Sequence, residues 1–404
     1  MTAPDLFPPT RDAALARIAA MRPDDYARTR NAIDGAVTRL SPYLTHGLVS
    51  LPEVLAGVLA RHPLHVQHKF VFELGWRAYF RHVWAHRGEA ILRSLHPGPL
   101  PDDAYACELP ADLRAGATGV PVIDRAVRTL YATGYLHNHA RMWLASYVVH
   151  LRKVHWRIGA DWMLGHLLDG DLASNHLSWQ WVAGTASRKP YLFNAGNVAR
   201  YAPPAWHSPG TPIDVSYEVL GAIARSPVAV NGSEGAAGVD EPPVGMVPPP
   251  ALPPDPEAVA GRDVWLVHPW ALGDPPTDLP AEAVRIGWWP AEPLARWPWS
   301  DRRLAFVAAR MQAITGQQWW GDRDALAQAL AGARSVATLS DPNLAELLPP
   351  QVAQRPPAWL FPEVARPCAS FSTWWHRVTR GLAQAEELPG LQAWQAALRD
   401  QRSR

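Results

Sequence analysis

A stretch rich in proline and glycine, residues 226–262, divides this chain of 404 residues into two parts with different sequence patterns. It reads SPVAVNGSEGAAGVDEPPVGMVPPPALPPDPEAVAGR and shows neither a helical nor a strand period. Proline lacks the backbone donor that helices and sheets need, so such a stretch forms an extended connection. We therefore expect a helical domain over 1–225, a linker over 226–262, an α/β domain over 263–365 and a helical segment over 366–404.

The part before the linker has the pattern of a helical bundle over residues 10–206. Residues 50–62 begin with a serine cap followed by glutamate at the third helical position. Residues 68–88 are apolar on almost every side, which is typical of a helix buried inside a bundle. Residues 121–134 end at a glycine, and residues 135–159 form a further long predicted helix that also ends at a glycine.

The part after the linker alternates between short buried strands and amphipathic helices. Strands are predicted for DVWLVHPW, AVRIGWWP, SVATLS and PAWLFP, and helices for WSDRRLAFVAARMQAI and DRDALAQALAGA. This alternation predicts a parallel sheet in a small α/β domain. The fold class is therefore mainly α, a helical bundle followed by a smaller α/β domain.

Cysteine content and the N-terminus exclude several classes of protein. Cys107 and Cys368 are too few for a disulfide framework or a four-thiolate iron–sulfur site. The first residues lack the apolar run of a secretory signal, and no apolar run is long enough to span a bilayer. We expect a cytoplasmic protein without membrane contact, and a monomer.

Charge is distributed unevenly between the two parts. Residues 1–210 contain 22 Lys+Arg against 16 Asp+Glu, which leaves 16 against 21 for the remainder of the 38 and 37 in the chain. A basic first part is suited to phosphate groups, and an acidic second part is not. His62, His65 and His68 could share one helical edge, but no acidic or cysteine ligand accompanies them, so no metal site is expected.

The stretch DGDLASNHLSWQWVAGT, residues 169–185, combines carboxylates, an amide and two indoles. Trp179 and Trp181 are two positions apart, so on a helix they point to nearly opposite sides. We expect one of them in the core and the other at the surface. Asn175 lies four residues before Trp179 on the same helical side, and a buried amide there needs hydrogen-bonding partners.

A second helix face carries Asn138, Arg141 and Met142 at positions i, i+3 and i+4. A buried arginine needs an acidic partner, and Asp169 and Asp171 are available for this. The pattern is compatible with a structural ion pair between helices and with a ligand site.

Hydroxyl groups gather where a helix is predicted to begin, at Thr38 and Ser41 with Arg39 between them. Free backbone N–H groups and hydroxyls at a helix start can bind phosphate. A serine followed by proline at such a position is also the ordinary cap of a helix.

Taken together, five segments resemble the photolyase/cryptochrome family over residues 26–206. They are TRLSPYLTHGLVS, FELGWRAYFRHV, GATGVPVIDRAVRTLYATGYLHNHARM, ASYVVHLRKVHWRIGADW and DGDLASNHLSWQWVAGT. The resemblance implies a helical domain that binds FAD folded back on itself. It places the ribose and diphosphate at Tyr26, Thr38, Arg39, Leu40 and Ser41, and the flavin and adenine at Arg77, Asn138, Arg141, Asp169, Asp171 and Asn175.

The resemblance also implies a substrate, damaged DNA that contains a cyclobutane pyrimidine dimer. Such a lesion must leave the duplex to reach a buried flavin. The positions that match dimer or DNA contacts are Glu73, Trp76, Asn138, His139, Met142 and Trp181. Asn175 matches the residue that faces flavin N5, and Glu73, Trp179 and Trp156 match residues that assist repair or carry electrons.

The implied reaction is light-driven repair by electron donation from excited, reduced FAD. Two alternatives stay open: a cryptochrome-like blue-light photoreceptor without repair activity, and a flavoprotein that binds nucleic acid without repairing it. An amide at Asn175 adds no negative charge beside a reduced flavin anion, and this favours repair.

The sequence departs from the family in several places. HLS (176–178) replaces the usual Asn-Gly-Gly, KPYLFN (189–194) replaces a longer loop, and no tryptophan stands at the usual outer position of the electron relay. Tyr105 or an indole of the second domain could take that position. The second domain resembles the family's antenna domain in a permuted order, or else is an unrelated α/β domain; no antenna chromophore can be assigned.

Overall fold

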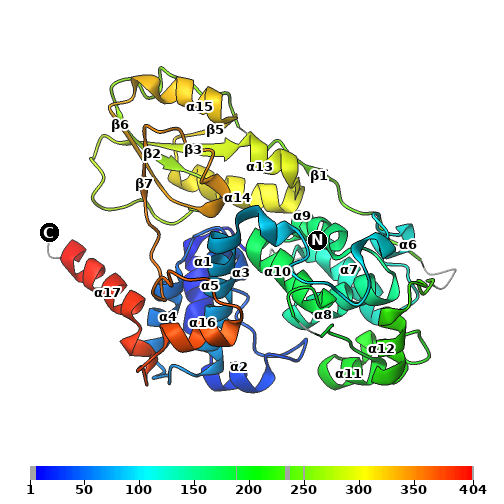
Figure 1. Cartoon of the computed structure of the whole chain (residues 1–404). Coiled ribbons are helices and arrows are strands. Elements are labelled where there is room, and N and C mark those ends of the chain that lie inside the picture. The colour runs from blue at the N-terminus through cyan, green and yellow to red at the C-terminus, as the bar shows by residue number, and fades with distance from the viewer. Residues whose placement is uncertain (1–5, 188, 233–236, 249–250, 403–404) are drawn as a thin grey trace.

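The computed structural model describes residues 6–187, 189–232, 237–248 and 251–402. Helices form the larger part of the molecule, and a five-stranded sheet with its own helices lies on one side of them (Figure 1). About half of the chain is helical, so the predicted class, mainly α with a smaller α/β part, is confirmed. Among these described residues, none of the helices is both long and apolar enough to cross a membrane.

The helical part has two cores. The first core includes Leu55 and Leu74 and continues into the sheet, where Trp288 and Trp319 belong to the same cluster; the second includes Trp143 and is confined to later helices. The α-helices of this part are α1 Arg11–Ala20, α2 Pro23–Thr29, α3 Ser41–Thr45, α4 Leu51–Leu59, α5 Lys69–Arg87, α6 Ala111–Arg114, α7 Pro121–Thr133, α8 Asn138–Ser146, α9 Trp156–His166, α10 Leu172–Ala183, α11 Ala195–Tyr201 and α12 Tyr217–Arg225.

Local capping explains several of these boundaries. Ser50 accepts a hydrogen bond from the Glu53 backbone at the start of α4, as its sequence predicts. Gly134 ends α7 in the left-handed conformation with φ 67°, which a residue with a Cβ adopts only at a cost. Asp171 caps α10, and Gly184 ends it with φ 82°.

The single helix predicted over 135–159 is wrong. α8 is followed by a π-helical turn, Tyr147–Leu151, and the helix is then interrupted until α9 begins at Trp156. Lys153 has φ 54°, which no helix accommodates, and its ammonium group donates to the carbonyls of His150 and Ile223 at 2.6 and 2.7 Å. Gly159 therefore lies inside α9 rather than at a helix end.

The sheet is entirely parallel, in the order β5-β3-β2-β6-β7. Its strands are β2 Asp263–Val267, β3 Val284–Pro290, β5 Gln317–Gly321, β6 Ser335–Leu339 and β7 Val352–Arg355, and its helices are α13 Ala291–Arg296, α14 Asp301–Ile314 and α15 Arg323–Ala329. The parallel sheet is thus confirmed, but PAWLFP forms no strand and β7 lies before it. In chain order the strands run third, second, first, fourth, fifth, so the direction of winding reverses between β2 and β6.

The described part of the predicted linker is attached to both parts of the molecule. Glu241 accepts hydrogen bonds from Trp162 and Arg114, at 3.0 and 2.5 Å. A two-residue strand, β1 Val244–Gly245, pairs with β4 Trp299–Ser300, and Leu252 forms a bridge with Trp319. The proline-rich chain is extended as expected, and polar contacts hold it against the surface.

The C-terminal segment returns to the helical part, as Figure 1 shows. α16 Phe371–Val378 packs against α5, and α17 Pro389–Arg402 packs against α4. The Trp375 ring lies where a Cβ on Gly75 would come within 2.5 Å of it, so glycine permits this close packing.

Candidate flavin site

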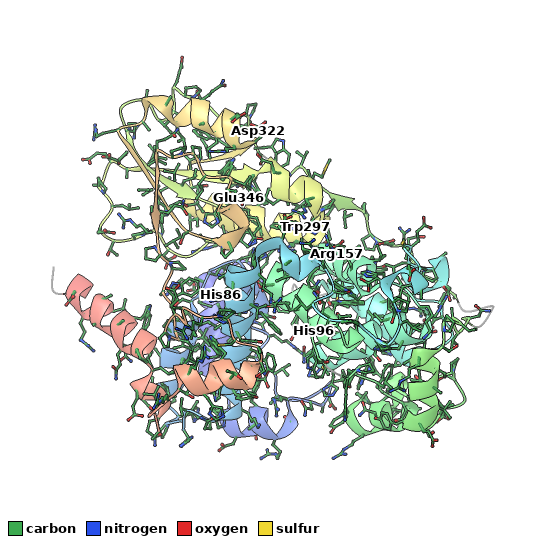
Figure 2. The ribbon with its side chains drawn as sticks, viewed as in Figure 1. His86, His96, Arg157, Trp297, Asp322 and Glu346 are labelled. Atoms are coloured by element: carbon green, nitrogen blue, oxygen red, sulfur yellow. The ribbon has the colours of Figure 1, made fainter. Side chains whose placement is uncertain are left out.

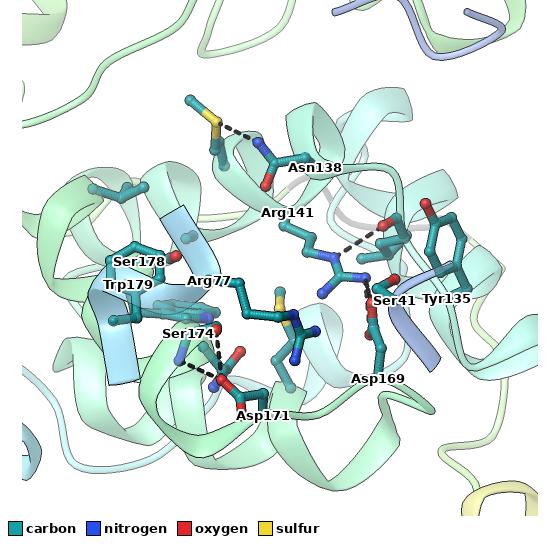
Figure 3. Close-up of a pocket in the computed structure, with 17 residues that line it drawn as sticks. Ser41, Arg77, Tyr135, Asn138, Arg141, Asp169, Asp171, Ser174, Ser178 and Trp179 are labelled. Carbon is teal, nitrogen blue, oxygen red and sulfur yellow. Dashed lines mark hydrogen bonds and ion pairs between the residues drawn. The ribbon is translucent and has the colours of Figure 1, made fainter. Parts of the chain in front are cut away.

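Two neighbouring cavities of about 250 and 230 Å³ lie among the helices. They share four lining residues: Ser41, Arg77, Tyr135 and Asn138. The first, cavity 1, is lined mainly by α5, α8 and α10, and Figure 3 shows its side chains pointing toward a common space. The second, cavity 2, lies next to α2, α5 and the residues just before α3.

Arg141 and Asp169 form the predicted ion pair at the wall of cavity 1. The guanidinium Nη2 donates to both Asp169 oxygens, at 2.7 and 2.9 Å, and Nε donates to the carbonyl of Leu136 at 2.9 Å. Burial alone would raise the pKa of Asp169, but Arg141, Ser41 and Arg77 lower it further than burial raises it. Asp169 is therefore an anion at neutral pH although it is only 5% exposed.

Asp171 and Arg77 each keep a polar atom without a hydrogen-bond partner among the described residues. Asp171 Oδ2 caps α10 by accepting a hydrogen bond from the backbone N–H of Ser174. Its buried Oδ1 has no hydrogen-bond partner among the described residues and lies 3.8 Å from Arg81. Arg77 donates from Nη2 to Thr45 at 2.9 Å, and its buried Nη1 has no such partner. An unsatisfied buried polar atom costs about 1–3 kcal/mol, so these two atoms mark a place where a ligand would complete the hydrogen bonding.

Asn175 and Trp179 share one side of α10, as their spacing predicts. The Asn175 amide nitrogen donates to the carbonyl of Ala160 at 2.8 Å, which directs Oδ1 away from that carbonyl. Trp179 is 2% exposed and lines cavity 1, with its ring packed over Gly159 of α9. Trp181 is 39% exposed, so the predicted division into one core and one surface indole is confirmed.

Cavity 2 brings together cationic and hydroxyl groups from the first helices. Arg39 lines it with φ 52°, a conformation that costs a non-glycine residue about 1 kcal/mol or more and is common at functional sites. Arg30 lies 3.4 Å from Glu73, whose pKa burial raises even though Arg30 opposes this. α3 has only five residues, so the phosphate site predicted at its start depends on side chains more than on the helix end.

Most of the predicted ligand contacts line one of the two cavities. Those in cavity 1 are Ser41, Arg77, Asn138, Arg141, Met142, Asp169, Asp171, Asn175 and Trp179; those in cavity 2 are Tyr26, Thr38, Arg39, Leu40, Ser41, Glu73, Arg77, Asn138 and His139. Asn138 donates to the Met142 sulfur at 3.5 Å, so the helix face predicted for this pair is confirmed.

Three predicted residues line neither cavity: Trp76, Trp156 and Trp181. Phe371 of α16 stacks on Trp76, with ring centroids 4.0 Å apart and an interplanar angle of 11°, so one indole face is covered. Trp181 is tilted against Tyr191 at 5.6 Å, and Trp156 lies in the second core.

The sequence did not indicate several cavity residues, among them Phe80, Tyr135, Ser174 and Ser178. Phe80 follows Arg77, Ser174 follows Asp171 and Ser178 follows Asn175, each by three positions, so each continues a helix face on which another member was already identified. The guanidinium of Arg141 lies 5.5 Å from the Tyr135 ring centroid. Helical periodicity could have found Phe80, Ser174 and Ser178, whereas Tyr135 lies between helices.

A chain of polar and aromatic contacts leads from Trp156 to the surface. The Trp156 and His176 rings are 6.2 Å apart, edge to face, and His176 contacts Asp161 at 2.8 Å. Trp297 of the α/β domain donates to the same Asp161 oxygen at 3.2 Å. Figure 2 shows Trp297 where the two domains meet, close to Arg157, which also binds Asp161.

Tyr105 lies on another side of Trp156. Its ring is 6.3 Å from His155, and the His155 ring is 5.6 Å from Trp156. Burial raises the pKa of Tyr105, so its phenol keeps its proton.

The helical part of the chain is similar to known proteins. Residues 70–204 match the FAD binding domain of DNA photolyase. The deoxyribodipyrimidine photo-lyase of Streptomyces griseus is 38% identical over 164 residues, which cover 40% of this chain and 36% of that protein. The enzyme of the same name from Salmonella typhimurium is 32% identical over 206 residues, which cover 47% of this chain and 43% of that protein.

A cryptochrome DASH of Gloeobacter violaceus is 33% identical over 173 residues, which cover 40% of this chain and 34% of that protein. The chain thus spans about two fifths of the length of these curated relatives, and their names include both photolyase and cryptochrome. Over its helical domain, the chain thus matches the photolyase/cryptochrome family.

Proposed function

We propose that cavities 1 and 2 together bind FAD and that the protein repairs cyclobutane pyrimidine dimers in DNA with light. The observation that carries the proposal is the pair of unsatisfied buried atoms in cavity 1, a donor at Arg77 Nη1 and an acceptor at Asp171 Oδ1. Asn175 adds an amide oxygen to the same cavity. A flavin dinucleotide carries the complementary donors and acceptors, and two adjacent cavities with shared lining residues suit a bent ligand.

The charges around cavity 1 also fit an anionic ligand. Four arginines approach this region: Arg77, Arg81, Arg141 and Arg303. Three carboxylates, Asp169, Asp171 and Asp341, face them, so one positive charge remains in excess. A reduced flavin anion would balance that charge, since an isolated buried charge is unfavourable.

In this proposal, the residues of the two cavities have different roles. The chemistry that bound FAD would supply, once reduced and excited by light, is reversible electron donation to the cyclobutane dimer. Asn175 would face the flavin ring with its amide oxygen and add no negative charge. Asn138 and Met142 would line the space for the extruded dimer, and Glu73, whose pKa burial raises, would form a hydrogen bond with the lesion.

Trp297 is the second-domain indole best placed to act as the outer member of the electron relay. Trp179 and Trp156 would carry charge between the cavity and the protein interior. The Asp161 carboxylate accepts the Trp297 N–H hydrogen bond, and its negative charge favours loss of an electron from that ring. Tyr105 is less suited, because its raised pKa keeps the proton that phenol oxidation must release.

Illumination with oligothymidylate that contains cyclobutane dimers tests the proposal. Repair restores the conjugation of the bases, so their ultraviolet absorbance should recover in the light and stay unchanged in the dark. Asn175→Asp should keep FAD bound but weaken the reduced anion by adding a charge beside it. Absence of any recovery with reduced, FAD-loaded protein would argue against repair.

One observation favours the second candidate, a cryptochrome-like blue-light photoreceptor. Phe371 covers one face of Trp76, so the wall predicted for the lesion is partly occupied by the protein's own C-terminal segment. A photoreceptor would bind FAD and respond to light without affinity for damaged DNA. DNA binding distinguishes the two, because phosphate contacts give an affinity that falls steeply with salt.

A further inference from the structure

The acidic loop, defined here as residues 164–171 and thus including the last three residues of α9, contacts the α/β domain on the side away from cavity 1. Arg303 of α14, only 1% exposed, donates from Nη2 to the Gly170 carbonyl at 2.6 Å and from Nη1 to the Leu164 carbonyl at 3.3 Å. Its guanidinium carbon lies 3.8 Å from the Trp299 ring centroid. A cation of the second domain thus joins both ends of a loop whose carboxylates, Asp169 and Asp171, line cavity 1.

Gly170 permits this contact. A Cβ at Gly170 would lie 2.4 Å from Arg303 Nη1 and 2.8 Å from the Leu164 carbonyl oxygen. No side chain fits between the loop and the guanidinium, so the small residue between the two aspartates is explained by Arg303.

Two further contacts connect the α/β domain to the same loop. Arg81 lies 3.3 Å from Asp341 and 3.8 Å from Asp171, so it bridges carboxylates of both domains. The His46 ring contacts the Pro269 carbonyl at 2.6 Å and the Leu168 carbonyl at 2.9 Å. Arg81 and His46, both of the helical domain, therefore each contact the acidic loop and the α/β domain at once.

Pro269 follows β2 and Asp341 follows β6, the two strands between which the winding reverses. In open α/β sheets, this place beyond the carboxyl ends of the strands is where ligands bind. Here it receives side chains of the helical domain, His46 and Arg81.

We propose that the α/β domain is a positioning unit for the flavin cavity and that Arg303 is its principal positioning residue. This inference rests on the proposed FAD site. Arg303 donates hydrogen bonds to two carbonyls of the acidic loop and so restricts its backbone. The carboxylates of Asp169 and Asp171 thereby keep their orientation toward the ligand. The carboxyl end of the sheet, where ligands bind in other open α/β sheets, serves here as the contact surface for the helical domain.

The charge of Arg303 matters as well as its hydrogen bonds. Burial lowers its pKa to about 9, while Asp169 and Asp171 oppose this, so the side chain stays a cation at neutral pH. A buried cation near the cavity stabilises a ligand that becomes negative on reduction. Loss of the charge should therefore shift the reduction potential of bound flavin to more negative values.

Arg303→Met and its matched control, Arg310→Met, provide the test. Arg310 is also buried in α14, but its hydrogen bonds go to Leu272 and Asp274 within the α/β domain. The first measurement is hydrogen exchange of the amides in residues 164–171 in flavin-free protein. Arg303→Met should speed this exchange at least about tenfold, the scale of a lost charge-assisted hydrogen bond, and Arg310→Met should not.

The second measurement is flavin affinity together with the reduction potential of bound flavin. Arg303→Met should weaken FAD binding about tenfold or more and lower the potential, and Arg303→Lys should restore the potential. Unchanged exchange, affinity and potential in Arg303→Met would overturn the inference. If the unmodified protein binds no FAD, the proposed function fails, while the exchange measurement still decides whether Arg303 holds the loop.

Discussion

The flavin cavity and the end of the sheet both gather buried polar groups, but they differ in whether those groups are satisfied. In the cavity, Arg77 Nη1 and Asp171 Oδ1 have no hydrogen-bond partner among the described residues. At the end of the sheet, His268 contacts the Leu339 carbonyl at 2.9 Å and Thr338 donates to the Leu266 carbonyl at 2.7 Å. The difference supports our proposal that the first region holds a ligand, whereas the second forms contacts within the protein.

The largest effect is expected from breaking the ion pair of the cavity. Asp169→Asn leaves the half-buried Arg141 without its anion and should cost about 3 kcal/mol of unfolding free energy, the lower end of the range for a buried pair. Asp278→Asn removes the partner of Arg355 on the surface of the α/β domain and should cost about 0–1 kcal/mol. Urea unfolding of both variants measures the contrast, and equal losses would show that the cavity pair is no more important than a surface pair.

Acid should weaken the helical domain through His150. Burial lowers the pKa of His150 to about 4, so below the ordinary value of 6.5 the unfolded chain binds a proton that the folded chain does not. Stability is therefore lost as pH falls from 6.5 toward 4, by about 1.4 kcal/mol per pH unit for this group. Asp169 and Asp171, whose pKa values are lowered, add a loss below their ordinary pKa of 3.8.

Unfolding curves at several pH values test this expectation. A helical domain whose stability is constant between pH 6.5 and 4 would contradict it. His150→Gln should reduce the pH dependence in that window, because glutamine does not titrate.

Trp181→Ala should weaken binding of dimer-containing DNA by about 1–3 kcal/mol, the usual contribution of an aromatic contact to a base. Trp76→Ala is the matched comparison, because Trp76 stacks on Phe371. We expect Trp76→Ala to lower the unfolding free energy more and the DNA affinity less. Titrations with fluorescent DNA measure both variants, and the reverse ranking would move the lesion pocket to Trp76.

The smallest effect on stability is expected at the electron relay. Trp297→Phe removes the hydrogen bond to the partly exposed Asp161 and should slow photoreduction of oxidised flavin. Tyr105→Phe should slow it less, because the Tyr105 phenol keeps its proton. Transient absorption compares the two, and equal rates in Trp297→Phe and the unmodified protein would remove Trp297 from the path.

Much of this site could be predicted because it lies on regular helices. Asn138, Arg141 and Met142 face one cavity, and Asn175 and Trp179 share a side of α10, since helical spacing fixes both arrangements. The strands β2, β3 and β6 were also identifiable from their apolar runs. β5 was not predicted as a strand, because QQWWG mixes polar residues with indoles, and Trp319 is nevertheless fully buried.

Contacts between distant segments could not be predicted from spacing. The break before α9 depends on Lys153, whose ammonium group binds carbonyls of a helix about 70 residues later. Trp297 and Arg303 lie beyond the linker in the sequence but contact the helical domain. No local pattern indicates which residues they contact there. The HLS departure is explained by His176, which is buried and contacts both Leu172 and Asp161.

Titration of the purified, flavin-free protein with FAD is the decisive measurement for the two cavities. We expect one FAD per chain, an affinity that Arg77→Met lowers because the donor Nη1 is lost, and an affinity that Arg310→Met leaves unchanged. A protein that binds no FAD, or binds it equally well without the Arg77 guanidinium, would show that the cavities are not the flavin site described above.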